Sequence, residues 1–317
     1  MDSRASVHPA SRPHPPAPVS LPVRAGRAAR SLLVRLARWN LLLALAMAAA
    51  TLTMQVLAGI APEPAAPLVV FLTFFAVYGL DRAAEPDADD LTHPERARFS
   101  RVHARLLRGT ALAAYALALP VAWTYAGPRG AAAALLPLAA VLLYSFPLLP
   151  APVARRVGFA RLKEVLVVKN LVVAATLSAT PTLLVLAGGA GPARAALLAS
   201  GAFLFGRWWI NTLTFDLRDE AGDRANGVRT VPVALGRART FRLLHGGNAL
   251  LGAAALAAPL LLPVGPRFAL LAWSSAYAWV YLRAMEGGGD EHFLCDVVAD
   301  GELLVLSALV LGTAAIA

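Results

Sequence analysis

Residues 195–223 read AALLASGAFLFGRWWINTLTFDLRDEAGD, and this stretch decides the fold. Its first part, 195–215, contains one charged side chain, Arg207. About 20 apolar residues are enough for an α-helix to cross the hydrocarbon core of a bilayer. Acidic residues follow at once, at positions Asp216, Asp219, Glu220 and Asp223. The stretch therefore predicts a membrane helix whose end carries a group of carboxylates.

Apolar stretches of similar length occur along most of the 317-residue chain, in which 58% of residues are hydrophobic and the mean hydropathy is +0.62. These values exclude a water-soluble globular domain. Eight more stretches lack Lys, Arg, Asp and Glu, namely 39–62, 64–80, 109–128, 130–154, 170–193, 243–266, 268–282 and 303–317. We therefore predict an all-α, polytopic membrane bundle of nine transmembrane helices.

The basic residues predict how this bundle is oriented. The net charge of +10 would suit a nucleic-acid partner, but the positions of the arginines exclude that interpretation. Seven arginines precede the first apolar stretch and six lie between the second and third, whereas the opposite face keeps only Arg129, Arg194 and Arg267. Positive charge gathers on the cytoplasmic side of membrane proteins. The pattern predicts a cytoplasmic N-terminus and an external C-terminus.

The beginning of the chain differs in composition from the rest. Residues 1–30 are rich in Pro, Ser, Ala and Arg, and we expect them to form a disordered basic tail. Residues 31–317 are expected to form one nine-helix membrane domain. Cys295 is the only cysteine, which excludes an internal disulfide and a multi-thiolate metal site.

The acidic residues gather on the predicted cytoplasmic face, because only Glu63 of the 19 Asp and Glu falls on the other side. One cluster follows 64–80 and begins with Asp81 and Glu85. On a continued helix these two residues share a face. In the second cluster, Asp216, Asp219 and Asp223 have i, i+3, i+7 spacing and share one stripe, while Arg218 and Glu220 point elsewhere.

Two facing carboxylate stripes predict a site for a hard cation. Mg²⁺ takes oxygen ligands and usually bridges protein carboxylates to substrate phosphates. The basic residues nearby would then grip the remaining phosphate oxygens; they are Arg82, Lys169, Arg218 and Arg224. The alternative interpretation is a solvated loop whose mixed charges only pair with one another.

At these two clusters the sequence resembles the UbiA superfamily of intramembrane prenyltransferases. The run DLRDEAGDR at 216–224, continued by GVRTVP at 227–232, is similar to that family's second aspartate motif. The family's first pattern, Asn-Asp-x-x-Asp-x-x-x-Asp, falls on Val77, Tyr78, Asp81 and Glu85. The leading Asn-Asp pair is therefore missing, and Glu85 replaces the last aspartate.

The resemblance implies an integral membrane enzyme that transfers an isoprenyl group from a prenyl diphosphate donor to a hydrophobic aromatic or lipid acceptor, with Mg²⁺ as cofactor. It implies metal ligands at Asp81, Glu85, Asp216, Asp219 and Asp223, of which all but Asp216 are also expected to be catalytic. It implies substrate-binding roles for Arg82, Lys169, Tyr144 and Asn211.

Several interpretations stay open at this point. Lys169 also fits a lysine that extends to the membrane surface from a helix end, and Asn211 also fits a hydrogen bond between helices. His93 is interpreted as a loop residue. A membrane terpene cyclase, or a transport or lipid-binding protein on the same fold, would share the topology. In each case we expect a multi-pass protein of the cytoplasmic membrane whose site faces the cytoplasm.

Overall fold

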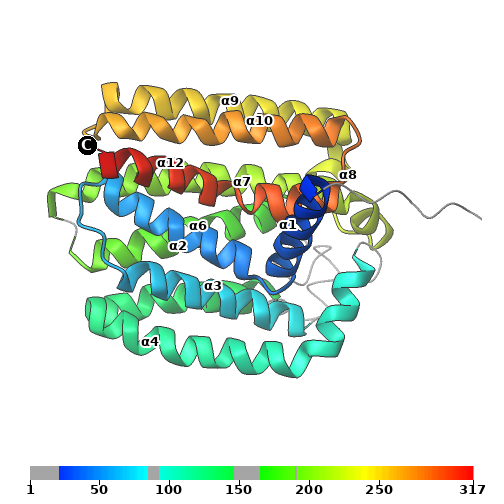
Figure 1. The fold of residues 1–317 in the computed structure, drawn as a ribbon, viewed down its shortest axis with the longest axis horizontal. Helices are drawn as coiled ribbons and strands as arrows, with labels where there is room; N and C mark the ends of the chain where they lie inside the picture. The colour runs from blue at the N-terminus through cyan, green and yellow to red at the C-terminus, as the bar shows by residue number, and fades with distance from the viewer. Residues whose placement is uncertain (1–20, 85–92, 146–164, 190, 317) are drawn as a thin grey trace, which may run out of the picture.

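The computed structural model describes residues 21–84, 93–145, 165–189 and 191–316, and within these ranges the chain is helical with no strand (Figure 1). The all-α prediction is thus confirmed. The long helices are α1 (Leu21–Arg38), α2 (Leu41–Leu57), α3 (Ala65–Ala84), α4 (Pro94–Ser145), α6 (Val168–Ala187), α7 (Arg194–Ala225), α9 (Arg237–Leu261), α10 (Ala272–Glu286) and α12 (Glu302–Ile316). The short elements are η2 (Gly191–Ala193), α8 (Val231–Leu235), η3 (Pro266–Leu271), α11 (Glu291–Phe293) and the π-helical turn η4 (Leu294–Ala299).

The bundle is formed by long helices that run side by side, while α1 lies across one end of it (Figure 1). Four described helices, α3, α4, α6 and α9, are each long and apolar enough to cross a membrane. A fifth crossing is possible if α1 and α2, which meet at an angle of 83°, count as one bent span.

Helix α4 consists of two antiparallel halves. Its backbone is non-helical at Ala126 and at Gly127, where φ is +59°. The hydroxyl of Tyr115 donates a hydrogen bond of 3.2 Å to the carbonyl of Ala134. In an unbroken helix these two residues would lie almost 30 Å apart, at about 1.5 Å per residue. The chain therefore turns back at Gly127.

Close packing between α6 and α7 fixes the two helices that carry most of the charged residues of interest. Gly201 on α7 faces Thr182 on α6 so closely that a Cβ atom there would lie 2.5 Å from the threonine hydroxyl. Small residues at helix contacts drive packing in membranes, because lipid is as apolar as the side chains. This contact sets the two helices beside each other along their length.

Helix α1 differs from the sequence prediction in its extent. It begins at Leu21, so residues 21–30, which were assigned to the basic tail, belong to a helix. Residues 1–20 lie outside the described part of the chain, and their predicted disorder stays a prediction.

Candidate functional site

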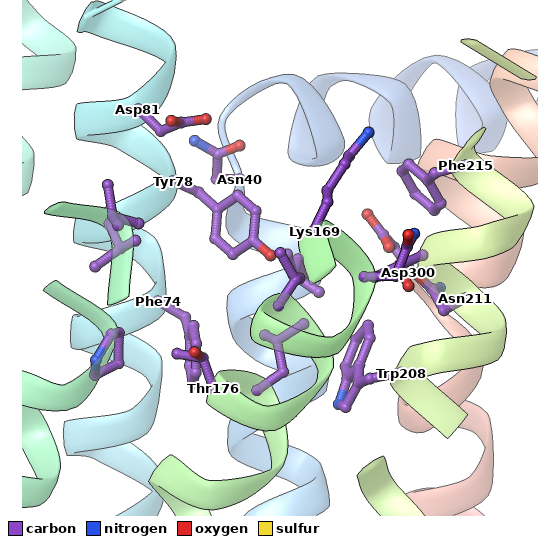
Figure 2. A pocket seen from close by; sticks show the side chains of 18 of the residues that line it. Asn40, Phe74, Tyr78, Asp81, Lys169, Thr176, Trp208, Asn211, Phe215 and Asp300 are labelled. Carbon is purple, nitrogen blue, oxygen red and sulfur yellow. The ribbon is translucent and has the colours of Figure 1, made fainter. Parts of the chain in front are cut away.

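A cavity of about 340 Å³ opens at the end of the bundle that α1 crosses. Its inner wall is apolar and includes Phe74, Val173, Leu177 and Trp208. Its charged wall carries Asp81, Lys169, Asp216, Arg218, Asp219, Asp296 and Asp300. Figure 2 shows Asp81 and Tyr78 on α3 at one side, Asn211 and Phe215 on α7 at the other, and Lys169 of α6 between them. The cavity thus combines a charged end with an apolar depth.

Asp216 is held by two residues at the start of α6. The ammonium of Lys169 lies 2.9 Å from Oδ1, and the amide of Asn170 donates a bond of 2.9 Å to Oδ2. The Asp216 side chain is only 1% exposed. A buried carboxylate is stable only when it is paired and hydrogen-bonded, so α6 supplies both requirements.

Asp219 is held by a guanidinium and an imidazole. Nε and Nη2 of Arg218 lie 2.8 and 2.9 Å from its two oxygens, and Nε2 of His93 lies 3.0 Å from Oδ1. Burial alone would raise the pKa of Asp219, but the hydrogen bond from His93 and the charge of Arg218 hold that pKa well below its usual range. Burial lowers the pKa of His93 from its ordinary value, which favours a neutral ring that donates to the carboxylate.

The expectation that Arg218 points away from the aspartate stripe is wrong. Its side chain is 3% exposed, and Nη1 lies 2.5 Å from a carboxylate oxygen of Asp296. The guanidinium curls back over the ring of Phe215, with its central carbon 4.5 Å from the ring centre. A helical wheel places only the Cα–Cβ direction, and a side chain as long as arginine can return to the neighbouring face. Arg224, by contrast, is 62% exposed and pairs with Glu220.

Asp223 differs from the two aspartates before it. Its Oδ2 is buried and has no hydrogen-bond partner. Burial, opposed by Lys169 and assisted by Asp216 and Asp219, raises the pKa of Asp223 to about 6. A buried carboxylate oxygen that lacks a donor and lies near two further carboxylates is a place where a cation would be stabilised.

The donor chemistry of this wall fits Mg²⁺, which prefers carboxylate oxygens. Within the described ranges, however, no three His, Cys, Asp or Glu side chains lie within metal-binding reach of one another. Mg²⁺ is commonly held by one or two carboxylates together with substrate phosphates. The arrangement therefore fits an ion that arrives with a phosphorylated ligand better than one held by protein groups alone.

The other predicted site residues take different positions. Asp81 lines the cavity from the last turn of α3. Arg82 lines it as well, and its Nη1 donates to the carbonyls of Ala37 and Arg38 at 3.3 and 2.6 Å, which ties the end of α1 to α3. Asn211 is 5% exposed and lines the cavity.

Two predicted residues are not placed by the structure. Glu85 lies outside the described residues. Tyr144 lies in the last turn of α4, but its side chain is not among those that the structure describes. Their assigned roles stay predictions.

Two carboxylates that the sequence analysis did not select also reach the cavity. Asp296 and Asp300 come from η4 and its end, on the wall beside Arg218. Burial and the charge of Asp296 raise the pKa of Asp300 to about 7. Asp296 and Asp300 are four residues apart, as Asp81 and Glu85 are, and this spacing is the sequence feature that could have identified them. A π-helical turn is rare and often marks a functional position.

Asn40 is a further residue that sequence reasoning missed. It joins α1 to α2 with a left-handed φ of +60°, lines the cavity and is only 4% exposed. Its side-chain nitrogen has no hydrogen-bond partner and makes no helix cap. Figure 2 shows it beside Tyr78 and Asp81. A buried amide donor without an acceptor costs free energy, so this donor is suited to an incoming oxygen atom.

Comparisons with known proteins place this fold. The model of the UbiA prenyltransferase family matches residues 65–294. A UbiA homologue from Archaeoglobus fulgidus, solved with GPP and Mg²⁺, superposes with a TM-score of 0.57 at 16% identity, covering 88% of this chain and 96% of that one. The same homologue with DMAPP and Mg²⁺ gives a TM-score of 0.58 at 16% identity, covering 88% and 99%.

A further solved structure, described as digeranylgeranylglyceryl phosphate synthase, gives a TM-score of 0.52 at 12% identity and covers 92% of this chain and 99% of that one. No curated protein matches the chain. At these identities the solved structures establish the fold alone.

Proposed function

The chain belongs to the UbiA prenyltransferase family, and from this premise we propose that its cavity binds a prenyl diphosphate together with Mg²⁺ and passes the isoprenyl group to a hydrophobic acceptor. The observation that carries the proposal is the pair Asp216 and Asp219 on the charged wall of an apolar cavity, beside Lys169 and Arg218. Asp223 follows one turn later on the same stripe of α7, outside the cavity lining, with its buried Oδ2. The homologue from Archaeoglobus fulgidus was solved with prenyl diphosphates and Mg²⁺, which supports this ligand class.

The charged end suits the ionisation of an allylic diphosphate. Breaking the carbon–oxygen bond leaves negative charge on the departing diphosphate, and bound Mg²⁺ supplies positive charge there. Lys169 and Arg218 now neutralise Asp216 and Asp219. A cation held by those carboxylates would weaken these two pairings, and the ammonium of Lys169 and the guanidinium of Arg218, which also pairs with Asp296, would then bind phosphate oxygens. Cations held in place before the reaction stabilise its transition state more than its ground state.

The apolar end suits the isoprenyl chain. Phe74, Val173 and Leu177 supply a hydrocarbon wall. Trp208 adds an aromatic face on this inner wall, and Phe215 adds one nearer the charged end. An aromatic face attracts a cation placed over it. We infer that these two rings lie beside the allylic carbon that becomes positive, and that the cavity wall keeps water away from it.

We infer the remaining roles from position. Asp81 supplies a carboxylate from the wall opposite Asp216. The ligand role of Glu85 is carried over from the sequence resemblance. Asn40 and Asn211 donate to substrate oxygens, and Tyr144 binds substrate from the end of α4. Arg82 lines the cavity and keeps the substrate-binding role expected from the sequence, while its bonds to two α1 carbonyls also hold α1 over the cavity.

We also infer nine crossings, with the N-terminus and the site on the cytoplasmic side of the cytoplasmic membrane. Each of the nine apolar stretches overlaps a helix in the described ranges, with α4 counted twice because it turns back at Gly127. The end of α12 lies at the end of the bundle opposite α1, as an odd number of crossings requires (Figure 1). Arginines gather at the α1 end.

The experiment is an incubation of the purified protein in lipid nanodiscs with a radiolabelled prenyl diphosphate and Mg²⁺, with and without candidate acceptors. Label should enter an apolar product only when an acceptor is present. If a cyclic hydrocarbon formed without any acceptor, the reaction at this site would be cyclisation of the prenyl diphosphate and not transfer of its isoprenyl group. That alternative is favoured by one observation, the missing Asn-Asp pair at Val77 and Tyr78.

A transport or lipid-binding role without chemistry is tested by the double variant Asp219→Ala/Asp223→Ala. If the effect of the protein in its host cell survived this double substitution, the enzymatic function would be contradicted. Loss of the effect, with the protein still present in the membrane, would support it.

A further inference from the structure

Helix α1 has three distinct faces, and the cavity accounts for only one of them. Positions 30, 34 and 37 face the bundle, positions 29, 32, 33 and 36 form an apolar stripe, and positions 27, 31 and 35 form a polar one. Each set follows the helical spacing of three and four residues. The sequence of α1 therefore specifies three surroundings at once.

The inward face belongs to the site. Arg30, Val34 and Ala37 line a second cavity, of about 580 Å³, which shares Arg82 and Asp296 with the first. Arg30 pairs with Asp290 at 2.5 Å and lies over the ring of Phe293, 4.7 Å from its centre. These contacts fix α1 across the mouth of the substrate cavity.

The apolar stripe is not used by the bundle. Leu32 is 57% exposed, Ala29 is exposed, and Leu33 and Leu36 are only partly buried. None of them belongs to a buried hydrophobic cluster among the described residues. Because α1 meets α2 at 83°, a bilayer crossed by α2 would lie nearly parallel to this stripe.

The polar stripe is basic. Arg27 and Arg35 are both exposed, and Arg35 donates a hydrogen bond of 3.3 Å to the hydroxyl of Ser31 on its own stripe. A helix with leucines on one face and arginines on another lies in the interface between acyl chains and headgroups. Anionic phospholipid headgroups complement the charge of the arginines.

We propose that α1 is a membrane-surface helix that inserts Leu32, Leu33 and Leu36 below the headgroups and binds anionic phospholipids through Arg27 and Arg35. The occupant of this surface is the bilayer that holds the bundle. Lipid contact then holds the inward face of α1 over the cavity mouth. The inference depends on the membrane placement of the chain and not on its chemistry, so its test uses no turnover measurement.

The first experiment measures the depth of the two outer stripes in the full chain. The variants Leu32→Cys and Arg35→Cys are labelled with a fluorophore and placed in nanodiscs that contain either lipid spin-labelled near the glycerol or water-borne iodide. Cys295 is fully buried, so the unsubstituted protein serves as the labelling blank. Leu250→Cys, at a position 72% exposed on α9, is the positive control for lipid contact.

The spin-labelled lipid should quench the label at position 32 several-fold more than the label at position 35, and iodide should show the reverse order. Equal quenching of both labels by iodide would show that α1 stands in water, and would overturn the proposal.

The second experiment compares nanodiscs of phosphatidylcholine alone with discs that also contain phosphatidylglycerol. The label at position 32 reports the ratio of α1 inserted in the lipid to α1 released from it. Anionic lipid should raise this ratio by about 5-fold for each arginine near the surface. The double substitution Arg27→Gln/Arg35→Gln should abolish this response.

The matched control is Arg129→Gln/Arg194→Gln, which removes two exposed arginines far from α1 and should leave the response unchanged. A phosphatidylglycerol response that survives Arg27→Gln/Arg35→Gln would show that these arginines do not make the contact, and would overturn the proposal.

Discussion

Asp216, Asp219 and Asp223 lie on one stripe of α7, yet each has different surroundings. Asp216 is neutralised by Lys169. Asp219 is neutralised by Arg218 and accepts a hydrogen bond from His93, whereas Asp223 keeps a buried oxygen without a donor. The protein's own cations therefore compete with any metal for the first two carboxylates. The third is the one at which a cation gains most.

Lys169 gives the sharpest test of this competition. In Lys169→Met, Asp216 loses its ammonium partner, so Mg²⁺ should bind the ligand-free protein about tenfold more tightly, a change of ~1.4 kcal/mol. Turnover should nevertheless fall roughly 10²-fold, because the cation that would bind the diphosphate is gone. Calorimetric Mg²⁺ titration and steady-state kinetics measure the two effects.

The conservative variant Lys169→Arg keeps the charge and should lie near the unsubstituted protein in both measurements. If Lys169→Met weakened Mg²⁺ binding in the absence of substrate, the lysine would not be a competitor of the metal.

Asn40 provides a second prediction at this scale. Asn40→Gly suits the φ of +60° and removes a donor that has no partner in the protein, so the unfolding temperature should change little. The kcat/KM for the prenyl diphosphate should fall by about 10- to 10²-fold, since a hydrogen bond to a charged group contributes ~1.5–3 kcal/mol. Unchanged kinetics would show that the amide does not meet substrate.

Some residue contacts could be predicted from sequence and others could not. The i, i+3, i+7 spacing places the three aspartates on one face because backbone geometry alone sets it. The bond from His93 to Asp219 spans 126 positions, and no local pattern encodes such a contact. The position of Asp296 on a π-helical turn could not be predicted either, because it depends on how the chain between α10 and α12 packs.

At the scale of elements, the turn in α4 makes two membrane-length halves from one helix. Gly127 combines a φ of +59° with a ψ of −148°, a region open almost only to glycine. A Cβ atom there would meet nothing within 4 Å, so the constraint is conformational and not steric.

Gly127→Ala should therefore destabilise the protein by about 1–3 kcal/mol, measured as free energy of unfolding in mixed detergent micelles. Gly109→Ala is the matched control in the same helix, because its Cβ also meets nothing within 4 Å and its φ is negative. That control should be neutral or stabilising by up to ~1 kcal/mol. Equal losses in the two variants would exclude the proposed strain.

Element positions were largely predictable, because runs without charge mark helices that face lipid. The extent of α1 was not. Residues 21–30 were grouped with the tail by composition, although the alternation of leucine and arginine continues into 31–38. The composition of a segment averages the polar and apolar faces of a helix, whereas an amphipathic helix is recognised by the difference between those two faces.

At the scale of the whole molecule, a buried charge network joins four helices away from the cavity. Arg207 on α7 lies 3.2 Å from Glu302 on α12, and donates to Asn248 on α9 at 2.7 Å and to Tyr281 on α10 at 2.9 Å. Both charged side chains are 2% exposed. The network accounts for the one charge inside 195–215, for which the sequence offered no role.

Arg207→Met should destabilise the protein by about 3–5 kcal/mol, because it leaves Glu302 buried without its cation. The double variant Arg207→Met/Glu302→Met should be more stable than Arg207→Met alone, since no unpaired charge remains. Denaturation in mixed micelles measures both. Losses that simply add would show that the two residues do not interact.

The all-α fold and the family were both accessible from sequence, through hydropathy and the run DLRDEAGDR, and the helices of the described residues and the family match agree with them. The cavity was not accessible, because its shape depends on how six or more helices meet. The acceptor is set by that shape and by no single motif.

The central claim is that the aspartate stripe of α7 and its neighbouring cations drive Mg²⁺-dependent ionisation of a prenyl diphosphate. The most direct measurement is the release of inorganic diphosphate from geranyl diphosphate by the protein in nanodiscs that contain a lipid extract as the source of acceptor. We predict release that requires Mg²⁺, falls at least 10²-fold in Asp219→Asn, and is unchanged in Glu286→Gln, whose carboxylate pairs with His245 and Arg283 outside the cavity. Release that persisted in Asp219→Asn, or that did not depend on Mg²⁺, would contradict the account.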